Sequence, residues 1–80
     1  MKMVNLREIL SLNIKAFRAT EGLSQDEFAA RCGLHRTYIG SVERQERNVT
    51  LEILNQLSTA MGVSAADLLT PQTRKVSAGE

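Results

Sequence analysis

Apolar residues recur at spacings of three and four along most of this sequence, which is the period of an α-helix. The first such segment begins after Asn5, a favoured N-cap residue that has Glu8 three positions later. It ends at Gly22, because glycine readily takes the left-handed conformation that closes a helix. The pattern therefore predicts a first helix between Asn5 and Gly22. Its apolar stripe is expected to consist of Leu6, Leu10, Ile14 and Phe17.

The second and third segments are shorter than the first. Ser24 and Glu27 form an S-x-x-E capping box, which predicts a second helix that stops at Gly33. A third helical segment is expected from about residue 35 to residue 44. The polar and charged stretch 44–49 that follows is expected to be a loop.

The last third of the chain shows the same start and stop signals twice more. Thr50 can cap a fourth helix, which Gly62 closes, and Ser64 opens a short fifth helix. We therefore predict an all-α domain of five helices over residues 1–71. Residues 72–80 are polar and are predicted to be a disordered tail.

Composition excludes several classes of function. The chain has 80 residues, 42% of them hydrophobic, which is enough for one small domain. A single cysteine, Cys32, permits no internal disulfide, so we expect a cytoplasmic protein. Cys32 and the one histidine, His35, cannot form a zinc site of the usual kind, and no metal or cofactor is expected. No apolar run approaches the roughly 18 residues needed to cross a membrane.

Catalysis is not expected either. A nucleophile, a base and an orienting acid must converge, and a small helical domain with one histidine and one cysteine offers no such set. The chain also lacks a glycine-rich phosphate loop, and it has no room for a separate ligand-sensing domain. We therefore predict that it is not an enzyme and that it binds no small-molecule ligand.

The junction between the second and third segments is the most informative part of the sequence. A small residue, Ala29, stands where two helices would cross closely, and Gly33 can take the positive φ of a tight turn. Two short helices that meet across such a turn form a helix-turn-helix. Its inward-facing positions are all apolar: Phe28, Cys32, Leu34, Ile39 and Val42.

Two stretches of sequence resemble a known family. Residues 23–34, LSQDEFAARCGL, resemble the L-S-Q-[ED]-x-x-A-x-x-x-G-[LV] signature of the lambda-repressor-like (XRE) DNA-binding domains. Residues 36–44, RTYIGSVER, with Arg47 and Asn48 after them, look like a run common in the controller proteins of restriction–modification systems. The resemblance covers about residues 5–70. It implies the five-helix lambda-repressor-like fold and a sequence-specific transcriptional regulator.

The resemblance also implies which residues contact the bases. In the family the third helix lies in the DNA major groove, and here the face opposite Ile39 and Val42 is expected to be exposed. An arginine at the leading end of that helix, Arg36, is well placed to hold a guanine through two hydrogen bonds. For Tyr38, packing on the core is an equally open reading. The expected base contacts are Arg36, Thr37, Tyr38, Ser41 and Arg44.

A second set of residues is implied to contact the phosphates. The family binds a phosphate at the start of the second helix, where Gln25 stands, and further phosphates after the third helix. For each of these residues the alternative is an ordinary solvated side chain. His35 is expected to cap or to be exposed rather than to approach a phosphate. The expected phosphate contacts are Gln25, Arg36, Arg47 and Asn48.

Two further expectations concern the scaffold. Arg18 and Glu43 resemble a pair that forms a partly buried ion pair between the first and third helices of family members. Many members also have glycine where the third helix ends, but this chain has Gln45. Either Gln45 takes a left-handed conformation at a cost of about 1 kcal/mol, or the helix ends in another way.

One helix-turn-helix reads few base pairs, so the family binds near-palindromic operators as a two-fold dimer. We expect a homodimer through the last helix, where Val63, Leu68 and Leu69 crowd together, although these residues could instead cap the core. Regulation of its own promoter would suit a controller protein, and activation would need a surface for RNA polymerase. The alternative function is an antitoxin-like protein-interaction module, for which residues 72–80 would be a poor arm.

Overall fold

The computed structural model describes residues 5–71 of the chain. These residues form five helices and no strand, which confirms the predicted all-α fold. The helices are α1 (Leu6–Glu21), α2 (Gln25–Cys32), α3 (Arg36–Glu43), α4 (Leu51–Met61) and α5 (Ala65–Leu68). Within the same range, no helix is long and apolar enough to cross a membrane.

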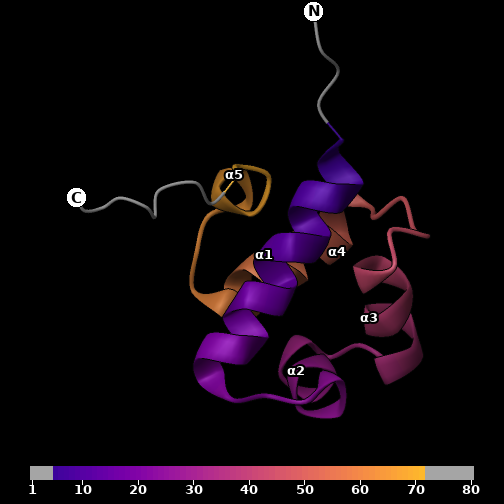
Figure 1. Ribbon diagram of the computed structural model, residues 1–80, viewed down its shortest axis with the longest axis vertical. Helices are drawn as coiled ribbons and strands as arrows, with labels where there is room; N and C mark the ends of the chain where they lie inside the picture. The colour runs from indigo at the N-terminus through magenta and orange to yellow at the C-terminus, as the bar shows by residue number, and fades with distance from the viewer. Residues whose placement is uncertain (1–4, 72–80) are drawn as a thin grey trace, which may run out of the picture.

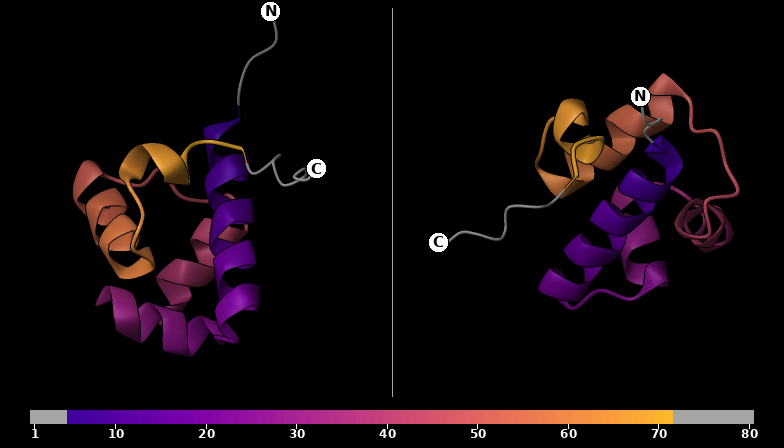
Figure 2. Two further views of the ribbon diagram at one scale, coloured as in Figure 1. Left: turned by 90° about the vertical axis from the view of Figure 1, so that its left-hand side faces the viewer. Right: turned by 45° about the horizontal axis from the view of Figure 1, so that its top comes forward.

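The longest helix, α1, runs through the length of the molecule and organises the others (Figure 1). It packs against α3 on one side and α5 on another, while α4 packs against α2 and α5. In Figure 2, α5 lies beside the N-terminal half of α1, and α2 lies beyond the C-terminal end of α1. The helix-turn-helix pair, α2 and α3, therefore stands at one end of the molecule and α5 near the other.

The predicted N-caps are present. The side chain of Asn5 accepts a hydrogen bond from the Glu8 backbone N–H, at 3.1 Å, and Thr50 caps α4 in the same way. Ser24 and Ser64 each open a helix with a complete capping box. Of the two expectations for His35, the structure has exposure, since its side chain makes no cap hydrogen bond at the start of α3.

Four helices end with the same backbone arrangement. After α1, α2 and α4 the residue with left-handed φ is a glycine, at 22, 33 and 62, as predicted. After α3 that residue is Gln45, with a φ of 65°. The N–H of Gln45 bonds to the Val42 carbonyl and that of Glu46 to the Ser41 carbonyl, which is the Schellman pattern seen at the three glycines. Of the two ways in which α3 could end, the structure has the left-handed glutamine.

The core lies where α1, α2, α3, α4 and α5 meet. Phe28, Ile14, Ile39, Leu57 and Leu68 are almost completely buried, and Phe17 packs against the cluster from outside. Leu6 was expected in the buried stripe of α1, but half of it is exposed, because it lies in the first turn beyond the reach of the core. Leu34 is only half-buried at the turn between α2 and α3.

Two buried polar side chains on α1 hold the ends of other helices. Ser11 Oγ donates to the carbonyl of Glu43, the last residue of α3, at 2.8 Å. Asn13 Nδ2 donates to the carbonyls of Leu68 at 2.7 Å and Thr70 at 3.1 Å, at the end of α5. Carbonyls at a helix C-terminus have no partner within the helix, so α1 supplies one to both helices.

Candidate nucleic-acid interface

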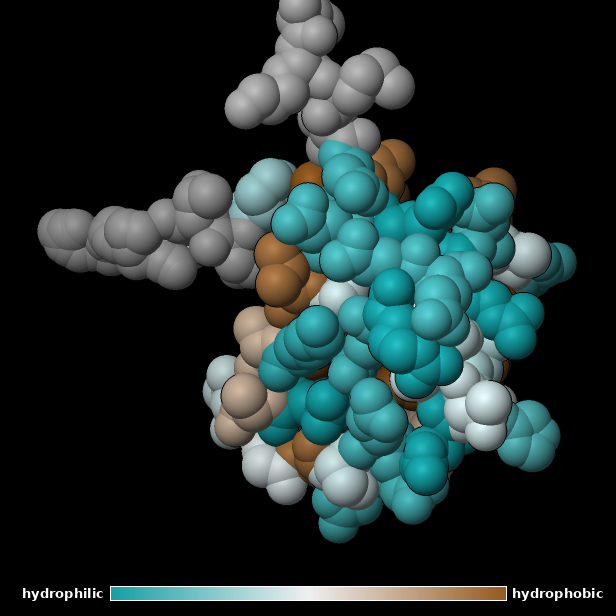
Figure 3. Space-filling model, turned by 45° about the vertical axis from the view of Figure 1, so that its right-hand side comes forward, coloured by the Kyte–Doolittle hydropathy of each residue, from teal (hydrophilic) through white to brown (hydrophobic). Residues whose placement is uncertain are grey.

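Helix α3 presents one exposed face, formed by Arg36, Thr37 and Arg44, while Tyr38 is half-buried at its edge. The opposite face enters the core through Ile39 and Val42, as predicted. Figure 3 brings this side of the molecule forward and shows a broad hydrophilic surface, with apolar patches mostly toward its left and upper edges.

Ser41 is not on the exposed face, and its predicted placement there is wrong. Its side chain is 6% exposed, because the loop after α3 turns back over it. The Ser41 hydroxyl donates to the Tyr38 carbonyl at 2.7 Å and accepts from Arg47 Nε at 3.1 Å. A hydroxyl committed to two partners and closed off from solvent cannot reach a base edge, so Ser41 orients the loop instead.

Gly40, one turn before Arg44 on α3, is buried beneath two side chains. A Cβ added at Gly40 would come 3.1 Å from Arg44 Nη1 and 3.6 Å from Gln25 Oε1. The Arg44 guanidinium therefore lies over the middle of α3, and the missing side chain leaves room for it. An alanine at this position would require the end of the Arg44 side chain to shift by a few tenths of an ångström, whereas its contact with Gln25 would be ordinary.

Arg18 and Glu43 form the ion pair that the family resemblance implies. Arg18 Nε lies 2.7 Å from Glu43 Oε2, and its Nη2 lies 2.8 Å from Oε1. Burial acts to raise the pKa of Glu43, but the hydrogen bonds from Arg18 and Gln25 and the positive charges of Arg18 and Lys15 outweigh it. The pKa of Glu43 therefore lies below its ordinary value, and the carboxylate is charged at neutral pH.

Gln25 belongs to the same network. Its Nε2 donates to Glu43 Oε1 at 3.0 Å, so the side chain is held between the start of α2 and the end of α3. One amide hydrogen of Gln25 is used in this way, and the other remains for a further acceptor. Arg18 also donates to the Leu23 carbonyl just before α2, which fixes the entry of the helix-turn-helix.

Two arginines of the exposed face stand beside carboxylates. Arg36 Nε lies 3.5 Å from Asp26 Oδ1, and Arg44 Nε lies 3.0 Å from Glu46 Oε2. All four side chains are more than half exposed, so water screens these pairs and each contributes little to stability. Either arginine can exchange its carboxylate for another acceptor at small cost.

The loop after α3 brings Arg47 and Asn48 beside Arg7. The Arg47 guanidinium lies 5.0 Å from the ring centre of Tyr38, a cation–π contact that keeps it against α3. Arg7 Nε donates to Asn48 Oδ1 at 2.8 Å. Arg7 was not predicted from the sequence, because its partner lies 41 positions away and two exposed polar residues leave no periodic pattern.

The residues expected at a dimer interface differ in exposure. Leu68 is 1% exposed, so the prediction that it forms an interface is wrong: it completes the core against α1. Val63 is 39% exposed and Leu69 is half-buried, so both can meet a partner. Leu51, at the start of α4, is 84% exposed and was not singled out from the sequence.

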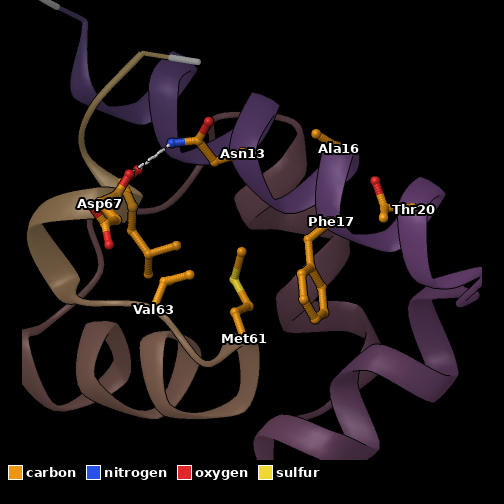
Figure 4. A pocket seen from close by; sticks show the side chains of 8 residues that line it. Asn13, Ala16, Phe17, Thr20, Met61, Val63 and Asp67 are labelled. Atoms are coloured by element: carbon orange, nitrogen blue, oxygen red, sulfur yellow. Dashed lines mark hydrogen bonds between the residues drawn. The ribbon is translucent and has the colours of Figure 1, made fainter. Parts of the chain in front are cut away.

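Two shallow hollows flank α5. One, of about 230 Å³, lies between α1 and the segment after α4, where Phe17, Met61 and Val63 turn inward and Asn13 points to the backbone of α5 (Figure 4). The other, of about 280 Å³, lies between the start of α1 and the start of α4. Its apolar lining is formed by Leu6, Leu10, Val49, Leu51, Leu54 and Leu69.

Cys32 is part of the core, where its thiol is unreactive. Burial raises the pKa of its thiol to about 11, so the thiol is protonated at neutral pH and is a poor nucleophile. Over the described range, no three residues of the types His, Cys, Asp and Glu gather where they could hold a metal ion.

Comparison with known proteins gives a match to one family model and to three proteins. The helix-turn-helix family model HTH_3 matches residues 14–68. Control protein C.SmaI from Serratia marcescens is 50% identical over 72 residues, which cover 90% of this chain and 86% of that protein. The structure of the hypothetical transcription factor NHTF from Neisseria matches with a TM-score of 0.84 and 40% identity, covering 90% of this chain and 81% of its own. The restriction–modification controller protein C.Esp1396I, solved as a tetramer in complex with its natural 35 base-pair operator, matches with a TM-score of 0.69 and 33% identity over 79% of this chain and 83% of that chain.

Proposed function

Because the chain belongs to the helix-turn-helix family, together with the control proteins that it matches, we propose that it is a restriction–modification controller protein. In this role it binds a near-palindromic DNA operator in the cytoplasm and regulates transcription from its own promoter. It has no catalytic role and needs no small-molecule ligand, so its own concentration sets the response. The observation that supports this most strongly is the exposed face of α3, which is polar, cationic and rigidly supported by α1 and α2.

In the proposed complex, α3 enters the major groove. Arg36 contacts a guanine edge and gives up its weak pairing with Asp26, while Thr37, Tyr38 and Arg44 contact neighbouring base edges. Ser41 takes no part, since it is buried. Gln25, Arg47 and Asn48 contact phosphates and fix the register of α3 on the duplex.

The proposed homodimer forms through α5 and the start of α4. Among residues 5–71, Leu51 is the most exposed large apolar residue, and it lines the same hollow as Leu6 and Leu69. Val63, on the other side of α5, is also exposed, so apolar side chains are available to a second copy on both sides of this helix. A second copy packed on this surface would bring two α3 helices to one face, as a palindromic operator requires.

Selection of binding sites from random duplex DNA, followed by sequencing of the bound pool, tests the function. A regulator of this kind enriches a motif with two-fold symmetry and half-sites about one helical turn apart. Occurrence of the motif before its own gene or a restriction gene would support the controller role. No enriched motif, with only weak salt-sensitive retention, would refute operator binding and favour a protein-interaction module, which a pull-down would then identify.

Sedimentation at micromolar concentration tests the dimer. Leu51→Lys should convert the protein to a monomer without unfolding it, because Leu51 lies outside the core. Leu12→Lys is the matched control, since Leu12 is 54% exposed but lines neither hollow. A wild-type monomer, or equal effects of the two variants, would contradict this interface.

Activation would further require contact with RNA polymerase, which transcription in vitro with purified polymerase would reveal as increased transcript.

A further inference from the structure

We propose that Arg7, in the first turn of α1, is a further DNA-binding residue, and that it acts with Asn48 as one site for a backbone phosphodiester. This inference rests on the proposed function, since it adds a contact to the same DNA interface. It places part of that interface on α1, outside the helix-turn-helix pair and the loop that follows it.

The first reason is the orientation of the Asn48 amide. A guanidinium can only donate hydrogen bonds, so the amide oxygen of Asn48 must face Arg7, and the structure has Arg7 Nε donating to Asn48 Oδ1 at 2.8 Å. The Asn48 Nδ2 group is thereby turned away from Arg7 with both of its N–H donors available. Arg7 thus presets Asn48 as a donor, which suits an acceptor such as a phosphate oxygen.

The second reason is the state of the Arg7 guanidinium. Arg7 is exposed, and no carboxylate among the described residues lies within ion-pair distance of it, in contrast to Arg36 and Arg44. Its Nε is held by a neutral oxygen, so its two terminal NH₂ groups and its full charge remain for an anion.

The third reason is that Arg47 is arranged in the same way nearby. Arg47 Nε donates to the neutral Ser41 hydroxyl, and its ring contact with Tyr38 is neutral as well. Arg47 directly precedes Asn48 in the loop after α3, and Arg7 is hydrogen-bonded to Asn48, so two uncompensated guanidiniums flank one amide donor. A polyanion that reaches the loop after α3 therefore meets Arg7 too, and in the proposed complex that polyanion is the DNA backbone.

The test measures operator affinity across a series of salt concentrations, with operator DNA and scrambled DNA in parallel. Arg7→Ala should weaken binding to both DNAs about tenfold at low salt. It should also reduce the magnitude of the salt slope by about 0.9 for each bound protomer, and therefore by about 1.8 for the proposed dimer, because each protomer loses one phosphate contact. Asn48→Ala should weaken binding without changing the slope, and the double variant should lose less than the two single losses combined.

Arg31→Ala is the matched control. Arg31 is an exposed arginine without a carboxylate in ion-pair distance among the described residues, and it lies six positions after Gln25, about 120° around α2. The Arg31→Ala substitution removes the same charge from a face of α2 turned away from α3, so it should change the salt slope of DNA binding less than Arg7→Ala does.

Three results would overturn the inference while operator binding by the wild type stands. The first is a salt slope of Arg7→Ala equal to that of Arg31→Ala. The second is a loss of DNA affinity in Arg7→Ala with an unchanged salt slope. The third is a double variant whose loss of affinity equals the sum of the losses in Arg7→Ala and Asn48→Ala. Absence of wild-type binding to either DNA would instead refute the proposed function. Far-UV circular dichroism of each variant confirms that the fold is kept, which is expected because both side chains are exposed.

Discussion

The carboxylate of Glu43, at the end of α3, is held by the guanidinium of Arg18 from α1 through two hydrogen bonds of 2.7 and 2.8 Å. Glu43 is 4% exposed and Arg18 is 21% exposed, so the pair is largely withdrawn from water. It fixes α3 to α1, the longest helix of the fold, and Gln25 adds a third contact to the same carboxylate.

Removal of one partner should therefore be costly. Arg18→Ala leaves a buried carboxylate without its counter-charge and should lower the free energy of unfolding by about 3 kcal/mol. Urea denaturation measures this loss. Arg44→Ala, which breaks only an exposed pair with Glu46, should cost less than about 1 kcal/mol. Exchange of the two charges, Arg18→Glu with Glu43→Arg, should recover part of the loss, and no recovery would argue that the two side chains do not support each other.

The lowered pKa of Glu43 predicts a dependence of stability on pH. A carboxylate with a lower pKa in the folded state stabilises the fold fully above its unfolded pKa of about 4.3. That contribution declines as the pH falls from this value through the folded pKa. Glu43→Gln should be less stable than the wild type at pH 7 but should lose less stability on acidification. Urea titrations at pH 7, 5, 4 and 3 would show this, and parallel pH profiles of the two proteins would contradict it.

The left-handed conformation of Gln45 indicates that a glycine at this position would stabilise the fold. A side chain in the left-handed region costs about 1 kcal/mol relative to glycine, and part of the gain is offset by the greater freedom of glycine in the unfolded chain. Gln45→Gly should therefore raise the free energy of unfolding by about 0.5 kcal/mol, read from the denaturation midpoint. Gln45→Ala keeps the Cβ and should give no gain. A stabilising alanine would mean that the glutamine side chain, rather than its backbone, is strained.

Substitution of Arg36 is expected to reduce the sequence specificity of DNA binding. Arg36→Ala should weaken operator binding by about 1–3 kcal/mol and relax the preference at one base pair, because one bidentate base contact is lost. Competition binding with single-base operator variants measures both effects. Asp26→Asn removes the carboxylate beside Arg36 and should keep or increase affinity. Equal losses by Arg36→Ala on operator and scrambled DNA would assign Arg36 to the phosphates instead.

The local parts of the fold could be predicted from the sequence because the residues that encode them lie close together. A capping box such as Ser24 and Glu27 spans four residues, and a closing glycine such as Gly33 acts on its own backbone. The apolar face of α3 was likewise evident from Ile39 and Val42, which lie three positions apart and therefore share one face of the helix.

The errors concern residues whose surroundings come from elsewhere in the chain. Ser41 was expected to be exposed, but Arg47 folds over it, and Leu68 was expected at a surface, but α1 covers it. The contact between Arg7 and Asn48 joins the first helix to a loop, and no helical period connects them. Helical periodicity gives the direction of a side chain from its own axis, whereas burial depends on which element arrives on that side.

Ser11 and Asn13 lie two positions apart on α1, yet one holds the end of α3 and the other the end of α5. The separation between α3, which is proposed to read DNA, and α5, which is proposed to pair with a second copy, is therefore fixed by α1. In a dimer built on α5, the two α3 helices would be connected through the α1 and α5 helices of both protomers, with no flexible linker between them. One additional base pair at the operator centre moves a half-site by about 3.4 Å and rotates it by about 35°. The spacing of the operator would then be dictated by two buried side chains that never approach the DNA.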